Sequence, residues 1–192
     1  MTQEMSAFAI VFAGQGSQSV GMMSGFAELP VVQRTFEEAS AILGIDLWNM
    51  ISAGPVEAQN QTVNTQPLML AAGVATYRAW LEKGGAQASC FAGHSLGEYT
   101  ALVAAGALPF ADALPLVRFR AQAMQDAVPE GVGAIAAVLG LDVEQVRAVC
   151  ADAALGEVVD AVNLNSPGQI VIAGHRAAVE RGMALARERG AK

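Results

Sequence analysis

Cysteine and histidine are scarce in this sequence. Its 192 residues include two cysteines, Cys90 and Cys150, which form no C-x-x-C pair, and two histidines, His94 and His175. A disulfide framework needs more cysteines than this, so we expect both thiols to be reduced residues of the core in a cytoplasmic protein. No cluster of histidine, cysteine and acidic residues has the spacing of metal ligands, so we expect neither a metal nor another cofactor.

Long apolar runs and blocks of positive charge are missing as well. The first apolar run, 7–13, is too short to span a membrane, and the residues before it carry no positive charge that would mark a secretory signal. The net charge is −7, and no basic block occurs before the C-terminal end, which argues against nucleic acid as a partner. Because 53% of the residues are hydrophobic, the chain can bury a sizeable core. We expect no membrane contact, and a monomer is taken as the default, since the sequence carries no signal of the oligomeric state.

The clearest positive signal is the run Gly93-His94-Ser95-Leu96-Gly97. Apolar residues 89–92 before it predict the end of a buried strand, and residues 98–105 after it predict a helix. A serine between two glycines in a tight strand-to-helix turn is typical of a nucleophile elbow. The helix N-terminus would favour an oxyanion beside such a serine. The alternative is that Ser95 only caps the helix.

A glycine-rich loop follows the first predicted strand. Residues 7–12 form a continuous apolar run, which predicts a central strand covered on both faces. Gly14-Gln15-Gly16 comes next, but Ser19 stands where a dinucleotide-binding G-x-G-x-x-G motif needs its third glycine. The loop therefore offers exposed backbone N–H groups at the C-terminal edge of a strand, where sites form in α/β sheets.

The remaining pattern predicts a large α/β domain over 1–128 and a smaller one over 129–192. In the large domain, helices are expected at 31–43, 46–53, 68–83 and 110–127. The third is expected to be buried and to follow the start signal Asn64-Thr65-Gln66-Pro67. In the small domain, strands are expected at 134–139, 158–164 and 169–173, and helices at 142–153 and 176–189. That β-α-β-β-α order is one strand short of a ferredoxin-like α+β unit, and the sequence ends where the last strand should begin.

One charged residue falls on the apolar face of a predicted helix. At 100° per residue, Arg120 lies between Val117 and Met124, on the side that should face the core. A buried guanidinium is costly unless an anion meets it. The pattern leaves two interpretations open: Arg120 binds a substrate carboxylate, or it forms a structural ion pair or extends its head to solvent.

Four segments together resemble the bacterial malonyl-CoA:acyl-carrier-protein transacylases, a family of acyltransferases. The segments are Phe12 to Gln18, Thr65 to Pro67, Gly93 to Tyr99 and Asn163 to Gln169, in the order and spacing of that family. Ala13 departs from it, since the family usually has proline there. The resemblance implies a hydrolase-like domain with a parallel sheet and a nucleophile elbow, into which a ferredoxin-like subdomain is inserted.

The resemblance also implies a ping-pong reaction of fatty-acid biosynthesis. The malonyl group would pass from malonyl-CoA to a serine and then to the phosphopantetheine thiol of acyl carrier protein. Ser95 would be the nucleophile, the backbone N–H groups of Gln15 and Leu96 would form the oxyanion hole, and Arg120 would hold the malonyl carboxylate. Further substrate-binding candidates on matching positions are Gln66, His94 and Asn165.

The catalytic base is the main departure from the family. The family uses a histidine C-terminal to the small subdomain, beyond the last residue of this sequence. His94 is expected to point away from the serine hydroxyl, and His175 is expected to be a turn or surface residue. Without a base, a serine hydroxyl is a weak nucleophile. Two alternatives therefore stay open: a serine hydrolase or thioesterase on the same elbow, and a non-catalytic fragment that binds carrier protein or coenzyme A.

Overall fold

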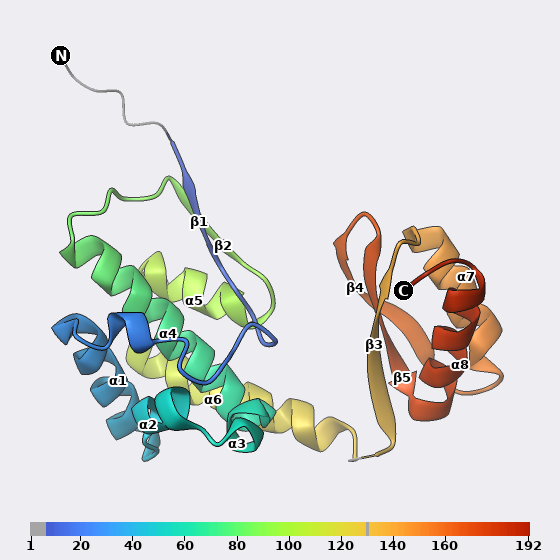
Figure 1. The fold of residues 1–192 in the computed structure, drawn as a ribbon, viewed down its shortest axis with the longest axis horizontal. Helices are drawn as coiled ribbons and strands as arrows, with labels where there is room; N and C mark the ends of the chain where they lie inside the picture. The colour runs from blue at the N-terminus through green and yellow to red at the C-terminus, as the bar shows by residue number, and fades with distance from the viewer. Residues whose placement is uncertain (1–6, 130) are drawn as a thin grey trace. The chain divides into compact units, whose positions relative to one another are not determined.

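The computed structural model describes residues 7–129 and 131–192, which form two compact units (Figure 1). The first unit is Met1–Gln125 and the second is Asp126–Lys192, whereas the sequence pattern placed the division between 128 and 129. Each unit is built around its own cluster of buried hydrophobic side chains.

The first unit contains a parallel pair of strands, β1 (Ala9–Phe12) and β2 (Cys90–Gly93). The expectation that β1 is covered on both faces is wrong for the described residues. Phe12 is buried against the rings of neighbouring aromatic residues, but Val11 is 72% exposed. Successive side chains of a strand point to opposite faces, and the described residues cover only one face of β1. Cys90, expected in the core, is also exposed.

Helices make up most of the first unit. They are η1 (Ser24–Phe26), α1 (Pro30–Leu43), α2 (Leu47–Ala53), α3 (Val56–Asn60), α4 (Thr62–Glu82), α5 (Leu96–Ala104) and α6 (Phe110–Ala127). As predicted, α4 is buried over much of its length; it packs against α1 and α5 (Figure 1). The end of α1 was also predicted correctly, because Gly44 takes the left-handed conformation (φ 67°) that favours glycine after a helix.

The predicted start of α4 after Asn64-Thr65-Gln66-Pro67 is wrong, since these four residues lie inside the helix. The preceding residues are held by hydrogen bonds that close the junction with α3, a helix the sequence pattern did not predict. The hydroxyl of Thr65 donates to the carbonyl of Gln59 at 2.6 Å and to that of Gln61 at 3.0 Å. These local bonds favour helix before the proline, so α4 begins at Thr62.

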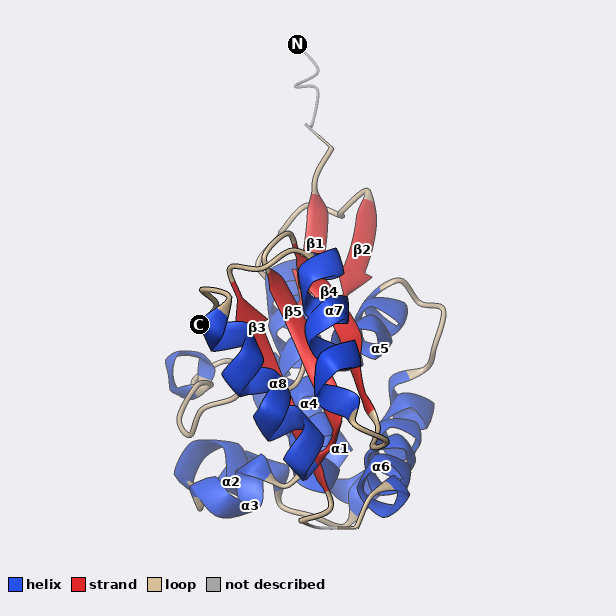
Figure 2. Cartoon of the chain, turned by 90° about the vertical axis from the view of Figure 1, so that its right-hand side faces the viewer, coloured by secondary structure: helices blue, strands red, loops and turns tan. Residues whose placement is uncertain are grey.

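The second unit has the predicted β-α-β-β-α order. Its elements are β3 (Gly133–Leu139), α7 (Val143–Ala154), β4 (Val159–Ser166), β5 (Gln169–His175) and α8 (Arg176–Glu188). The sheet is antiparallel with the order β3-β5-β4, and α7 and α8 cover one of its faces (Figure 2). Lys192 exchanges two backbone hydrogen bonds with Leu139 of β3, at 2.8 and 2.9 Å. Since β5 occupies the other edge of β3, Lys192 lies where the fourth strand of a ferredoxin-like sheet pairs.

In the part of the chain that the structure describes, no helix is long and apolar enough to cross a membrane.

Candidate active site

Ser95 lies at a sharp turn between β2 and α5, as the sequence predicts. Its φ of 52° and ψ of −111° are unusual for a residue with a side chain, which is the strain expected of a nucleophile elbow. Ser95 occupies the N-cap position of α5, but its hydroxyl makes no capping hydrogen bond. The interpretation of Ser95 as a helix cap alone is therefore wrong, because its hydroxyl oxygen accepts no hydrogen bond from the backbone N–H groups at the start of α5.

The two glycines of the motif allow the backbone of the elbow to close. A Cβ atom added to Gly93 would collide with the carbonyl group of Gly97, and one added to Gly97 would collide with the carbonyl of Phe12. The obstacles are backbone atoms, which cannot rotate away as a flexible side chain can. The turn is completed by a hydrogen bond of 2.9 Å from the Gly97 N–H to the His94 carbonyl. Glycine at both positions is thus required by close approach.

The glycine-rich loop after β1 lies beside the elbow. Phe12 and Gly93 are opposite each other in the parallel pair, so both following loops leave the same end of the strands. The two loops are in contact, since a Cβ atom on Gly14 would lie 2.7 Å from the His94 carbonyl oxygen. This contact places the loop that carries Gln15 against the elbow.

Side chains from the start of α4 and the end of α3 hold this loop in place. The amide of Gln15 donates to the hydroxyl of Thr62 at 3.2 Å. The side-chain amide of Gln18 makes two hydrogen bonds: its oxygen accepts from the N–H of Gly16 at 2.7 Å, and its nitrogen donates to Asn60 at 3.0 Å. Among the described residues of the first unit, the backbone N–H groups of Gln15 and Leu96 donate no hydrogen bond, so both remain able to bind an oxyanion.

Arg120 reaches the elbow from α6. Its Nη2 donates to Ser95 Oγ at 2.9 Å, and its Nη1 donates to Gln66 Oε1 at 2.7 Å. The guanidinium also lies over the ring of Tyr99, 5.7 Å from its centroid. No carboxylate among the described residues of the first unit forms an ion pair with Arg120. The structural ion pair considered for this residue is therefore not found there, and the groups of that unit that contact the cation are neutral.

The remaining predicted site residues fall in different places. Gln66 is fully buried behind Arg120, so it contacts the arginine and is not exposed to a ligand. His94 is exposed, and its imidazole lies towards Gly14. Asn165 belongs to β4 of the second unit, where its amide donates to Gln169 at 3.3 Å.

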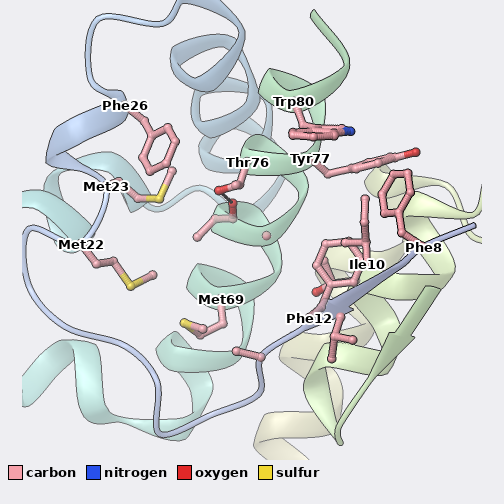
Figure 3. A pocket seen from close by; sticks show the side chains of 15 residues that line it. Phe8, Ile10, Phe12, Met22, Met23, Phe26, Met69, Thr76, Tyr77 and Trp80 are labelled. Carbon is pink, nitrogen blue, oxygen red and sulfur yellow. Dashed lines mark hydrogen bonds between the residues drawn. The ribbon is translucent and has the colours of Figure 1, made fainter. Parts of the chain in front are cut away.

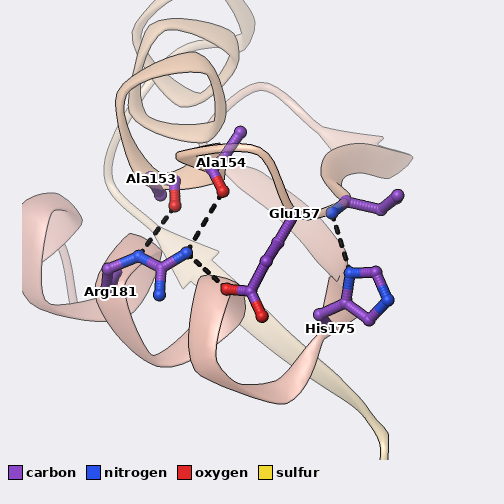
Figure 4. Close-up of polar contacts among 6 residues, drawn as sticks. Ala153, Ala154, Glu157, His175 and Arg181 are labelled. Atoms are coloured by element: carbon purple, nitrogen blue, oxygen red, sulfur yellow. Dashed lines mark hydrogen bonds and ion pairs between the residues drawn. The ribbon is translucent and has the colours of Figure 1, made fainter.

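His94, the histidine of the first unit, makes no hydrogen bond with the serine hydroxyl. Among the described residues of the first unit, Ser95 Oγ is hydrogen-bonded to Arg120 and to no imidazole or carboxylate. His175 ends β5, and its Nδ1 accepts from the N–H of Val158 at 2.9 Å (Figure 4). That bond joins the start of β4 to the start of α8, which agrees with the expected turn position.

Sequence reasoning missed several residues that support the site. Tyr99 was part of the elbow motif, but nothing in the sequence indicated that its ring would lie against Arg120. The fold also brings Thr62 to Gln15, Asn60 to Gln18 and Met124 to Gln66. Their only signal was proximity to a motif in the chain, as with Thr62 just before the Thr65-Gln66-Pro67 segment.

A separate apolar hollow of about 480 Å³ lies between β1 and α4 (Figure 3). Its lining includes Phe8, Phe12, Met23, Met69 and Trp80. An apolar pocket is a common ligand site, but catalysis also needs convergent polar groups. Those groups gather at the elbow, which we therefore take as the candidate active site.

A family model and a curated relative both relate this chain to acyltransferases. Residues 9–192 match the acyl transferase domain family. Over 189 residues, the chain is 55% identical to the malonyl CoA-acyl carrier protein transacylase of Escherichia coli (strain K12), covering 98% of this chain and 61% of the relative. The chain therefore spans about three fifths of the length of that relative.

Solved structures agree with this match. The acyl-carrier-protein S-malonyltransferase of Burkholderia pseudomallei 1710b superposes with a TM-score of 0.94 at 61% identity, over 97% of this chain and 61% of that one. A malonyl-transacylase solved in complex with a holo type II PKS acyl-carrier protein has a TM-score of 0.94 at 53% identity, with the same coverage of 97% and 61%.

Proposed function

This chain belongs to the acyl transferase domain family, and we propose that it moves a malonyl group from coenzyme A to acyl carrier protein through an ester on Ser95. The E. coli relative is named for this reaction, and one structural neighbour was solved with a carrier protein bound. The observation that carries the proposal is the hydrogen bond from Arg120 to Ser95 Oγ, which puts a cation beside the nucleophile. None of the ion pairs among the described residues of the first unit includes this cation.

In the first half-reaction, Ser95 Oγ attacks the thioester carbon of malonyl-CoA. The C–O bond of the ester forms, the C–S bond breaks, and coenzyme A leaves as its thiol. The N–H groups of Gln15 and Leu96 stabilise the oxyanion of the tetrahedral intermediate. In the second half-reaction the phosphopantetheine thiol attacks the ester carbon, and Ser95 regains its hydroxyl.

Arg120 selects the acyl group in this proposal. A carboxylate can accept two parallel hydrogen bonds from a guanidinium, which fixes its orientation as well as its position. Gln66 and Tyr99 hold the guanidinium in advance, so little ordering is needed when the malonyl group binds. An enzyme for neutral acyl groups gains nothing from a cation at this point.

The proton of the serine hydroxyl must pass to a base. The described residues of the first unit place no imidazole or carboxylate on Ser95 Oγ, so the proposal requires a base that these contacts do not supply. We also propose a cytoplasmic location, which both cysteines support because they are free thiols.

Labelled malonyl-CoA tests the reaction. The protein is incubated with malonyl-CoA carrying the label in its acyl group, with and without holo acyl carrier protein, and the label is followed on Ser95, on the carrier and in free malonate. We expect an adduct on Ser95 that passes to the carrier thiol, and no adduct in Ser95→Ala.

The other possible results decide against the proposal. Label that leaves only as free malonate while carrier protein is present would identify a hydrolase on the same elbow. Binding of malonyl-CoA with neither adduct nor malonate would identify a binding module.

A further inference from the structure

Gln66 is a polar side chain in the core of the first unit. It lies on α4 and is 0% exposed. Burying a primary amide costs free energy unless its oxygen and nitrogen find hydrogen-bond partners. A glutamine in this position therefore needs a reason other than filling space, which a leucine or methionine would do without that cost.

Both ends of the amide are directed towards α6. The oxygen accepts from Arg120 Nη1 at 2.7 Å, and the nitrogen donates to the sulfur of Met124 at 3.4 Å. The reverse orientation would place an NH₂ group against the guanidinium, which has only donors. The chemistry of the two partners thus fixes the amide in one orientation, and the amide in turn fixes one arm of the guanidinium.

The groups that hold Arg120 in the described part of the first unit are neutral. The amide of Gln66, the hydroxyl of Ser95 and the ring of Tyr99 together position the guanidinium, and no carboxylate in the described part of the first unit pairs with it. A carboxylate at position 66 could make the same hydrogen bond, but it would cancel the positive charge. Glutamine positions the cation and leaves its charge available to an anion.

We propose that Gln66 is a positioning residue that makes the site selective for an acidic acyl group. It does so by orienting Arg120 without neutralising it, and it does not touch the substrate. This inference rests on the proposed function, because it assumes that Arg120 binds the malonyl carboxylate. It replaces direct substrate binding as the expected role of Gln66.

The test measures how well the chain discriminates malonyl-CoA from acetyl-CoA. All proteins carry Ser95→Ala, so that no acyl transfer occurs, and the dissociation constants of both thioesters are measured by titration calorimetry. We expect Gln66→Glu to weaken malonyl-CoA binding by roughly tenfold or more, because the new carboxylate pairs with Arg120 and repels the substrate's. Acetyl-CoA binding should change by less than about twofold, since acetyl has no charge.

Gln66→Met and Gln59→Glu complete the set. Methionine is similar in size to glutamine but offers Arg120 no oxygen, so Gln66→Met should selectively lower the affinity for malonyl-CoA. This variant keeps the test available if Gln66→Glu does not fold, because it buries no charge. Gln59 is a second buried glutamine, 1% exposed, whose side-chain nitrogen has no partner among the described residues. Gln59→Glu therefore introduces a buried carboxylate at a side chain that is not hydrogen-bonded to the guanidinium, and it should leave discrimination unchanged.

Equal losses for both thioesters in Gln66→Glu and Gln66→Met would overturn the inference, because a merely structural residue affects both alike. Arg120→Ala in the same background separates this failure from that of the proposed function. If Arg120→Ala lowers malonyl-CoA affinity while the Gln66 variants do not, only the role of Gln66 is wrong. If Arg120→Ala has no effect either, the carboxylate role of Arg120 fails as well.

Discussion

The guanidinium of Arg120 lies 2.9 Å from the hydroxyl oxygen of Ser95, although Ser95 lies in the turn before α5 and Arg120 lies on α6, 25 residues later in the sequence. This distance limits the acyl group that can use both residues. A carboxylate on the guanidinium and a carbonyl carbon on Ser95 Oγ must be joined by a very short chain. The single methylene of a malonyl group meets that requirement, and a longer dicarboxylic acyl group would have to fold back on itself.

Arg120→Ala should change which acyl group the protein accepts. Removing the guanidinium would take away the two charge-assisted hydrogen bonds proposed for the malonyl carboxylate, so kcat/KM for malonyl-CoA should fall by about 100-fold or more. Acetyl-CoA needs no cation and should lose less than about threefold. The measurement is the rate of adduct formation on Ser95 with each thioester.

Arg118→Ala is the matched control for this change. Arg118 is exposed on the same helix and donates to the carbonyl of Leu43 at 3.0 Å, away from the elbow. Arg118→Ala removes the same charge from the protein as Arg120→Ala. A similar loss of malonyl-CoA use in both variants would therefore mean that net charge, and not the Arg120 contact, is responsible.

Gly97→Ala should unfold the elbow. The new methyl group would collide with the backbone carbonyl of Phe12 in β1, so α5 must move away from the strand. We expect the free energy of unfolding to fall by at least ~2 kcal/mol, as measured by urea denaturation.

Gly25→Ala controls for the loss of a glycine. Gly25 has open space where its Cβ would be and needs no left-handed backbone. Its replacement should leave stability unchanged or raise it by up to ~1 kcal/mol, because alanine restricts the unfolded chain. A Gly97→Ala protein as stable as Gly25→Ala would show that the elbow tolerates a side chain.

The sequence predicted best what depends on local geometry. The elbow around Ser95 needs glycines at fixed spacing, and the αL end of α1 at Gly44 needs a residue without Cβ, so both could be recognised from residue order. Arg120 could be recognised because a charge interrupts an apolar face. Its partners Gln66 and Tyr99 could not, since no pattern in one helix shows which side chain of another will face it.

The errors have the same origin. Pro67 is a common first residue of helices, but hydrogen bonds between α3 and α4 extend the helix before it. Cys90 lies in an apolar run typical of a buried strand, yet burial depends on which elements cover the strand. Both outcomes are decided by tertiary contacts that local propensity does not contain.

The two cysteines should differ in reactivity. Cys150 is buried in the second unit, and its pKa is raised, mainly by burial and further by the nearby charge of Asp160. Cys90 is exposed. We expect a thiol reagent such as DTNB to modify Cys90 in the native protein and Cys150 only when denaturant is added, since the thiolate is the reacting form.

The raised pKa of Cys150 also predicts a dependence of stability on pH. The folded protein keeps the thiol proton at a pH where the unfolded chain loses it. The resulting stabilisation is complete below the ordinary thiol pKa of about 8.5 and is lost as the pH rises through the folded-state pKa. Denaturation across this range should therefore show a steeper loss of stability in the parent and in Cys90→Ala than in Cys150→Ala. Equal slopes in all three proteins would contradict the shift.

Gln18→Ala should slow acyl transfer without changing which acyl group is used. Gln18 joins the N–H of Gly16 to Asn60, so its loss frees the loop that carries the Gln15 N–H. That N–H is one of two donors proposed for the oxyanion, and an oxyanion donor acts in the transition state for any acyl group. We expect adduct formation from malonyl-CoA and acetyl-CoA to slow equally, by about tenfold, with little change in KM.

Gln33→Ala is the control for this change. It removes a comparable side-chain hydrogen bond, from the amide of Gln33 to the carbonyl of Ala27, in a part of the same unit that does not hold the loop. A selective loss of malonyl-CoA use in Gln18→Ala would instead mean that the loop acts through Arg120.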